Sequence, residues 1–276
     1  MNEASVGHQC PECVADGRRT QRSPRTAFGG TVAGQEGTVT KILLGVNVAV
    51  LIFGVLLAGT RAAVGGSGIF SGAGAVQAFG AVVARTVYLT PGGQVFLQPV
   101  GGARSFPGID DGGYYRLITA MFIHYGVLHL LMNMWALWIL GRQLEGALGR
   151  WRFLALYLLA GLGGNVAAYL FSPNALSAGA STALFGLFAA FAIVVRRLGG
   201  SLSSVIPILV INLIITFAVP GISIAGHLGG LVTGAMVGAG LAYAPRNART
   251  QVQLACLAGV FVLLAFLTLL GPTLHA

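Results

Sequence analysis

Seven long apolar runs divide the chain, and polar or charged residues cluster between them. A helix that crosses the hydrocarbon core of a bilayer needs about 20 mostly apolar residues, because each residue advances the helix by about 1.5 Å. The runs are Ile42–Gly59, Leu117–Leu140, Phe153–Phe171, Ala180–Val195, Leu202–Val219, Ile222–Tyr243 and Val252–Leu270. This pattern predicts an all-α, polytopic membrane protein, a bundle of seven transmembrane helices.

The basic residues between the runs indicate an orientation. Cytoplasmic loops of membrane proteins carry an excess of Lys and Arg. With the N-terminus placed in the cytoplasm, 12 of the 16 Lys and Arg fall in the N-terminal tail or in cytoplasmic loops, and the other four lie in one long outer loop over residues 60–115. We therefore expect a multi-pass protein of the cell membrane with its N-terminus in the cytoplasm and its C-terminus outside.

Composition agrees with the membrane interpretation. Of 276 residues, 55% are hydrophobic and 8% are charged, and the mean hydropathy is +0.82. A soluble domain carries about 25% charged residues, so a soluble enzyme, a disordered chain and a disulfide-stapled module are excluded. The net charge of +9 follows from the cytoplasmic loops, so we expect the lipid bilayer, and no nucleic acid, as a partner.

Ser181 stands at the start of an unusually short run. Ala180–Val195 would form a helix of about 24 Å, and Arg196 and Arg197 fix its inner end. Ser181 is therefore expected in the first helical turn, below the outer surface, where free backbone N–H groups can donate to a developing negative oxygen. Gly179, two residues earlier, would let a substrate backbone approach closely. The alternative interpretation is a serine that caps a helix.

His227 is expected at a similar depth, because its run also begins at the outer surface. Histidine is the usual base for an activated serine. Gly230 and Gly234 follow at the spacing that lets membrane helices pack closely. The alternative is a histidine that hydrogen-bonds a neighbouring helix for packing alone.

His129 and Asn133 are four residues apart, so they share one face of the second predicted helix. Their side chains are suitable oxyanion donors. His124 lies five residues before His129 and is expected on a different face. A structural hydrogen-bond network between helices is the alternative for all three.

Several chemistries are excluded by what the spans contain. The last acidic residue is Glu145, which we place in a cytoplasmic loop, so any hydrolase here must use a Ser–His dyad without a third acid. There is no H-E-x-x-H motif, and the three histidines have no thiolate or carboxylate nearby to complete a metal site. We expect no cofactor. Three further intramembrane polar residues are interpreted as packing residues: Asn165, Asn212 and Thr216.

Taken together, these segments resemble the rhomboid family of intramembrane serine proteases. Residues 124–133 read HYGVLHLLMN, which is similar to the family's H-x4-H-x3-N pattern. Residues 179–182 read GAST and resemble its G-x-S-x pattern, and residues 225–234 read AGHLGGLVTG and resemble its A-H-x2-G-x3-G pattern. The resemblance covers about residues 40–245, in order and on the expected spans.

The resemblance implies a role for each of these residues. Ser181 would be the nucleophile and His227 the general base. His129 and Asn133, with the Ser181 backbone N–H, would form the oxyanion hole. His124 would be structural or would shape a water-accessible cavity.

The motifs also differ from the family's usual residues. Phe185 stands where an aromatic residue, often Tyr, packs on the catalytic histidine, and Thr182 stands where Gly is frequent. Tyr115-Arg116 replaces the frequent Trp-Arg before the second span. Gly179 and Gly230 are expected to support the site.

The resemblance divides the chain into three parts. Residues 1–40 form a cytoplasmic tail, residues 41–245 a rhomboid protease core, and residues 246–276 an extra C-terminal transmembrane helix. The tail holds Cys10-Pro-Glu-Cys13, half of a zinc-ribbon-like site, which resembles the end of a Cys-rich module that precedes some bacterial rhomboid cores. Two ligands are too few for tetrahedral zinc, so Cys10 and Cys13 are only a weak candidate metal site.

The sequence thus predicts an endopeptidase that cleaves single-span membrane proteins, admitted sideways near the second and fifth spans. Two alternatives stay open. One is a catalytically inactive rhomboid-like protein that binds membrane clients, and the other is a small-molecule transporter, because intramembrane polar residues also mark transport pathways.

Overall fold

The computed structural model describes residues 2–3, 8–20, 25–31, 36–59, 73–203 and 205–275. These residues form ten helices and five short strands. The helices are α1 (Pro11–Thr20), α2 (Thr38–Ala58), α4 (Ala75–Gly80), α5 (Arg116–Thr119), α6 (Val127–Leu148), α7 (Arg150–Phe171), α8 (Ser181–Arg197), α9 (Val205–Ala218), α10 (Ile224–Ala242) and α11 (Arg249–His275). The strands are β1 (Asn2–Glu3), β2 (His8–Gln9), β3 (Val87–Leu89), β4 (Val95–Phe96) and β5 (Arg104–Phe106).

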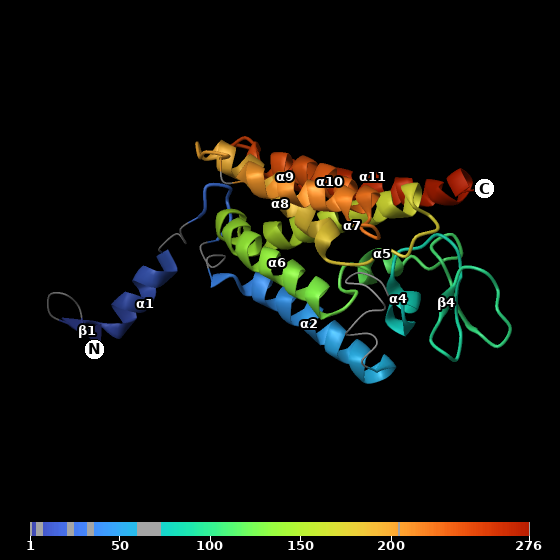
Figure 1. The fold of residues 1–276 in the computed structure, drawn as a ribbon. Helices are drawn as coiled ribbons and strands as arrows, with labels where there is room; N and C mark the ends of the chain where they lie inside the picture. The colour runs from blue at the N-terminus through green and yellow to red at the C-terminus, as the bar shows by residue number, and fades with distance from the viewer. Residues whose placement is uncertain are drawn as a thin grey trace.

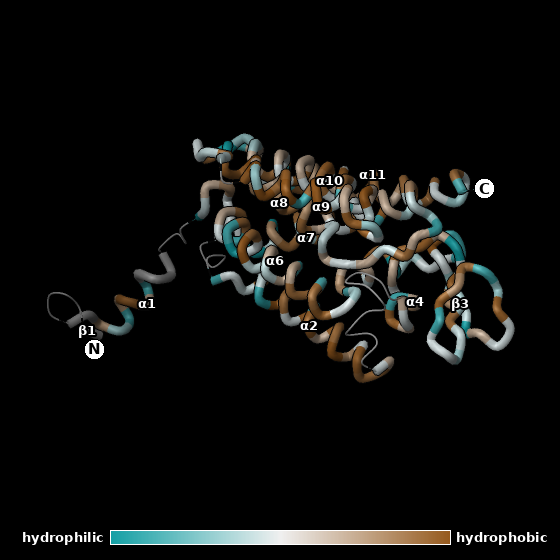
Figure 2. The backbone as a smooth tube through the Cα atoms, viewed as in Figure 1, coloured by the Kyte–Doolittle hydropathy of each residue, from teal (hydrophilic) through white to brown (hydrophobic). Residues whose placement is uncertain are grey.

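Within the described residues, four helices are long and apolar enough to cross a membrane: α2, α7, α10 and α11. The apolar helix α9 is shorter, with 14 residues, and α8 has 17. Large apolar side chains face outward on these helices, as on α2, where Leu56 is 78% exposed. Figure 2 shows brown, hydrophobic stretches along the helices of the bundle, for example along α2. An outward apolar surface is what a polytopic membrane protein presents to lipid, and the count of seven spans stays a prediction.

The second predicted span is wrong as a single helix. Leu117–Leu140 is divided into α5, a turn over residues 120–126, and α6, which continues to Leu148. Gly126 precedes α6 with φ 95°, a backbone conformation that side-chain-bearing residues rarely adopt. His124 therefore lies in the turn before α6 and not on the helix that carries His129.

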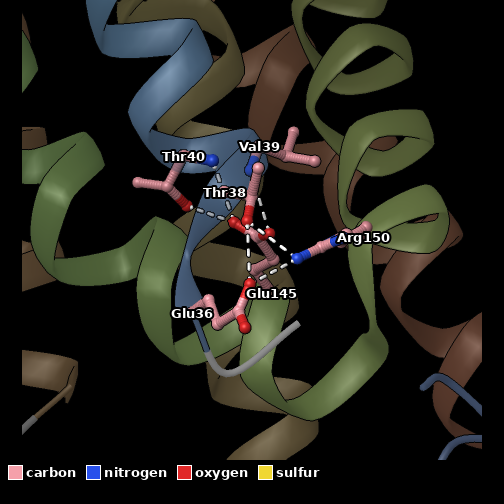
Figure 3. A network of polar contacts seen from close by, with 6 residues as sticks. All are labelled: Glu36, Thr38, Val39, Thr40, Glu145 and Arg150. Atoms are coloured by element: carbon pink, nitrogen blue, oxygen red, sulfur yellow. Dashed lines mark hydrogen bonds and ion pairs between the residues drawn. The ribbon is translucent and has the colours of Figure 1, made fainter. Parts of the chain in front are cut away.

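Glu145 is also placed differently from the prediction. It is buried in the last turn of α6, and Figure 3 shows its carboxylate pointing at the start of α2. The carboxylate accepts hydrogen bonds from the backbone N–H groups of Val39 and Thr40, both at 2.9 Å, and from the Thr40 hydroxyl at 2.8 Å. An anion at a helix N-terminus satisfies N–H groups that have no partner within the helix. Glu145 is therefore a structural link between α2 and α6.

The centre of the bundle is formed by α7, α8 and α10, which lie side by side in Figure 1. Their contact faces are lined with small residues. A Cβ added to Gly234 of α10 would lie 2.2 Å from the Cα of Gly186 on α8. The two helix backbones can approach this closely only because both positions are glycine.

Residues 73–115 of the predicted outer loop form a small subdomain, which includes α4, at one end of the bundle (Figure 1). Its antiparallel sheet has the order β4-β3-β5, and Tyr88 of β3 pairs with Phe96 and Ser105. The guanidinium of Arg116 is fully buried and donates to the carbonyl oxygens of Pro107, Ala81 and Ala78, each at 2.7 Å. A single guanidinium thus joins three parts of the loop. Residues 60–72 of the predicted loop lie outside the described residues.

The C-terminal helix α11 is longer than the predicted run Val252–Leu270 and ends beside this subdomain (Figure 1). Asp110 of the loop accepts a hydrogen bond from the Tyr169 hydroxyl of α7 and lies 3.0 Å from Nδ1 of His275 on α11. The loop, the central helix α7 and the last helix are therefore tied together at one point.

Candidate active site

Ser181 and His227 are in direct contact. Ser181 is the first residue of α8 and His227 is the fourth residue of α10. The distance between Ser181 Oγ and His227 Nε2 is 2.9 Å. The contact depends on Gly230, because a Cβ there would lie 1.9 Å from the carbonyl oxygen of Thr182 and would push α10 away from α8.

Ser181 does not cap α8. Ala180 occupies the N-cap position, and no side chain makes a capping bond there. In contrast, Ser223 does cap α10, since its hydroxyl accepts from the Gly226 N–H at 3.1 Å. The serine hydroxyl that starts α8 therefore points at a histidine, while its backbone N–H lies in the first helical turn.

His129 points at the same position from α6. A Cβ added to Gly179 would lie 3.0 Å from His129 Nε2 and 3.4 Å from Ser181 Oγ, so both atoms border one small space. His129 Nδ1 accepts from the Tyr125 backbone N–H at 3.3 Å. A neutral imidazole carries one proton, so Nε2 is left with the N–H and faces this space as a donor.

Asn133 lies one turn further along α6 and lines the same cavity. Its Nδ2 donates one hydrogen to the His129 carbonyl at 2.9 Å. An amide nitrogen carries two hydrogens. The bond to His129 therefore uses only one of the two amide hydrogens of Asn133.

His124 supports the loop that precedes Ser181. Its ring is buried, its Nε2 accepts from the Ala180 backbone N–H at 3.4 Å, and its Nδ1 lies 3.3 Å from the Phe122 carbonyl. Gly179 in that loop has φ 139° and donates to the Ala120 carbonyl at 2.8 Å. Hydrogen bonds to the turn before α6 thus fix the loop over Gly179 and Ala180. His124 contacts this loop directly.

Phe185 stacks on the imidazole ring of His227. Its ring centroid is 4.1 Å from that of His227, with an angle of 19° between the two planes. Phe185 lies one helical turn after Ser181, so α8 supplies both Ser181 and the aromatic ring that packs on the imidazole of His227.

Thr216 contacts the Nδ1 edge of His227, and sequence reasoning missed it. Its hydroxyl lies 2.7 Å from His227 Nδ1 and donates to the Asn212 carbonyl at 2.8 Å. A threonine inside an apolar helix is usually explained by such a bond to the preceding turn. The only sequence signal was therefore a polar residue at position 216 within an apolar run. That signal did not indicate a contact with His227.

These groups open onto a cavity of about 450 Å³ between α6, α8 and α9. The described residues that line it include no Asp or Glu, and no group of three or more potential metal ligands occurs in the described part of the chain. Cys10 and Cys13 are both exposed, free thiols at the start of α1. The apolar lining comes from facing helices, for example Trp135 and Ile139 of α6 and Ile208 and Ile215 of α9.

The fold and this site define a helical membrane protein with a Ser–His pair below its surface. A family model for the rhomboid domain matches residues 111–244. The chain is 40% identical over 148 residues to Rhomboid protease GluP of Bacillus subtilis (strain 168), covering 51% of this chain and 28% of GluP. It is 35% identical over 133 residues to YdcA of the same strain, which is named rhomboid protease, covering 46% of this chain and 67% of YdcA.

A plant relative matches over a similar stretch. The chain is 38% identical over 141 residues to RHOMBOID-like protein 6, mitochondrial, of Arabidopsis thaliana, covering 48% of this chain and 45% of that protein. The chain thus spans less than half the length of GluP and of this plant protein. On the matched segment and the motifs within it, the chain belongs to the rhomboid family.

Proposed function

We propose that this protein is an intramembrane serine endopeptidase that cleaves single-span membrane proteins within or near their transmembrane segment. The observation that carries the proposal is the 2.9 Å contact between Ser181 Oγ and His227 Nε2, at the edge of an apolar cavity. A serine hydroxyl is a weak nucleophile until a base takes its proton. The family membership supports the same activity.

The first half of the reaction forms an acyl-enzyme. Ser181 Oγ attacks the carbonyl carbon of the scissile peptide bond as His227 Nε2 takes the hydroxyl proton. The tetrahedral intermediate places its negative oxygen among three donors: the Ser181 backbone N–H, His129 Nε2–H and the second Asn133 Nδ2–H. The C–N bond then breaks, and His227 returns the proton to the leaving amine.

Water completes the reaction. His227 Nε2 takes a proton from a water molecule, the hydroxide attacks the acyl carbon, and the ester bond to Ser181 breaks with return of the proton to Oγ. Each step uses only groups of this chain and water, so the proposed activity needs no cofactor. Water would reach the site from the end of the bundle where the outer loop lies.

The substrate would be a transmembrane helix that enters from the lipid between α6 and α9. The cavity is lined by apolar side chains of both helices and reaches the Ser–His pair at its polar end. A helix must unwind locally to expose its peptide bond to Ser181, so residues of low helix propensity near the cleavage site, such as glycine, favour cleavage.

The charge pattern supports the cell membrane as the location, with the N-terminus in the cytoplasm and the C-terminus outside. On this orientation, residues 1–40 form a cytoplasmic tail, residues 41–245 the protease core, and residues 246–276 an additional helix. The C-terminus and the outer loop lie at the same end of the bundle (Figure 1), as this orientation requires.

The test is cleavage of a labelled single-span protein by the purified full chain in lipid vesicles, beside Ser181→Ala. Ser201→Ala is the matched control, because Ser201 is exposed in the segment between α8 and α9 and lies outside the cavity lining. We expect cleavage by the wild type and by Ser201→Ala, and none by Ser181→Ala. A serine-directed fluorophosphonate probe should label the same two active proteins.

Other results would favour the alternative functions. Binding of the single-span protein without cleavage, together with no fluorophosphonate labelling, would favour an inactive membrane-binding protein. Uptake of a small solute into vesicles that Ser181→Ala leaves unchanged would favour a transporter. Equal cleavage by wild type and Ser181→Ala would contradict the assignment of the nucleophile.

A further inference from the structure

Thr216 of α9 is the one described hydroxyl that contacts the Nδ1 side of His227 in the structure. We propose that Thr216 is a positioning residue that holds His227 in the tautomer able to accept the Ser181 proton. This inference deepens the proposed function and rests on it. In a Ser-His-Asp triad the acid performs this task, and the described lining of this cavity has no acid.

The number of protons decides which group donates. The Thr216 hydroxyl has one hydrogen and two neighbours, the Asn212 carbonyl at 2.8 Å and His227 Nδ1 at 2.7 Å. A carbonyl oxygen only accepts, so the hydroxyl hydrogen goes to Asn212. His227 Nδ1 must then carry the ring proton and donate it to Thr216.

This assignment leaves the correct atom available on the other side of the ring. With the proton on Nδ1, His227 Nε2 has a lone pair, and that lone pair faces Ser181 Oγ at 2.9 Å. With the proton on Nε2, the ring nitrogen would instead donate to Ser181 Oγ and would have no lone pair to take the serine proton. The tautomer therefore determines whether the pair can react.

The placement of Thr216 suits this task. Among the described residues of α9, only Val205 and Thr216 are buried, and Thr216 is 2% exposed. The bond from its hydroxyl to Asn212, one turn earlier, fixes the side-chain rotamer. Phe185 stacks on the face of the imidazole and limits rotation of the ring. Translation of α9 away from α10 would remove the acceptor from Nδ1.

The first test measures the tautomer directly and does not depend on proteolysis. The full chain is labelled with ¹⁵N-histidine, and the His227 ring resonances are identified by their loss in His227→Ala. We expect the wild type to carry its proton on Nδ1, and Thr216→Val, which has a similar shape and no hydroxyl, to lose this preference. Thr268→Val is the matched control, since the buried Thr268 hydroxyl of α11 makes the same bond to the preceding turn, at 2.8 Å to Leu264.

A wild-type His227 with its proton on Nε2 would overturn the inference. So would a Thr216→Val spectrum with an unchanged His227 tautomer. Thr216→Ser restores the hydroxyl, so it should restore the Nδ1 proton, and its failure to do so would assign the effect to packing.

The second test separates positioning from folding. We expect Thr216→Val to lower kcat roughly 10- to 100-fold with KM nearly unchanged, a smaller loss than removal of a charged triad acid because a neutral hydroxyl is a weaker partner than a carboxylate. Thr216→Ser should recover most of kcat, and Thr268→Val should match the wild type. Full activity of Thr216→Val would contradict the inference, whereas a wild type that cleaves nothing would contradict the proposed function and leave the tautomer measurement to decide the role of Thr216.

Discussion

Glu145 near the end of α6 accepts hydrogen bonds from the backbone N–H groups of Val39 and Thr40 at the start of α2. A buried carboxylate is tolerated there because three donors and the positive end of a helix surround it (Figure 3). The residue joins the first membrane helix to the core without any cation in contact with its oxygens among the described residues.

The first prediction follows from this capping contact. Glu145→Gln should lower the free energy of unfolding by about 1–3 kcal/mol, because a charged acceptor is lost and one backbone donor is left without a partner. Thermal unfolding in detergent measures the loss. Glu36→Gln is the control, since the ion pair of Glu36 with Arg150 at 2.6 Å is solvent-exposed and should contribute less than about 1 kcal/mol. Equal effects of the two changes would contradict the structural role of Glu145.

The second prediction concerns the approach of α8 and α10. Gly230→Ala should reduce the cleavage rate by roughly 100-fold or more, because the new methyl group would meet the Thr182 carbonyl and move His227 away from Ser181. Fluorophosphonate labelling should fall with it. Gly259→Ala on α11 is the matched control, because a Cβ there meets nothing within 4 Å. Wild-type labelling by Gly230→Ala would show that the Ser–His contact does not need this close packing.

The third prediction tests the proposed role of Asn133 as a hydrogen-bond donor to the oxyanion. Asn133→Ala should lower kcat by about 10²- to 10³-fold with little change in KM, the range observed for loss of one oxyanion-hole donor. Asn247→Ala, in the exposed segment between α10 and α11, should behave as wild type. Steady-state kinetics on the labelled substrate distinguish the two. A rise in KM with kcat unchanged would instead assign Asn133 to substrate binding.

The fourth prediction concerns the outer end of α11. Asp110→Ala and His275→Ala should be non-additive, with a coupling energy of about 0.5–3 kcal/mol, because the two side chains are in contact at 3.0 Å. Thermal unfolding of the single and double variants gives this energy. The neighbouring Asp111, which instead accepts bonds from Thr86, should show a smaller coupling to His275. An equal coupling for both aspartates would mean that the pair does not fix α11 specifically.

Much of the candidate site could be predicted from sequence, because its polar side chains occur in segments that are otherwise apolar enough to cross a membrane. Ser181, His129 and His227 stand in or beside apolar runs, where polar residues are costly, and their order matches the rhomboid motifs. The helix break at Gly126 could not be predicted in the same way, because the mean hydropathy of the predicted run Leu117–Leu140 is high on both sides of the break. His124 was consequently placed on a helix, although it lies in the preceding turn.

The contact of Thr216 with His227 and the partners of Glu145 were not predicted from sequence, for different physical reasons. Thr216 satisfies its own hydroxyl within α9, so nothing local reveals its second neighbour on α10. Glu145 follows a predicted span and looks like a loop residue, while its partners are more than 100 positions away in sequence. Both contacts join elements distant along the chain, and only the packed bundle brings them together.

The exposure of α9 has a consequence for the lipid environment in which the proposed activity is measured. Its 14 residues span about 21 Å, less than the about 30 Å of a typical hydrocarbon core, and most of its large side chains face outward. A bilayer adjusts to such a short helix by thinning around it. If Thr216 positions His227 as proposed, lipid thickness affects the proposed proton transfer. The same protein in short-chain and long-chain lipids is then expected to differ in turnover more than in substrate affinity.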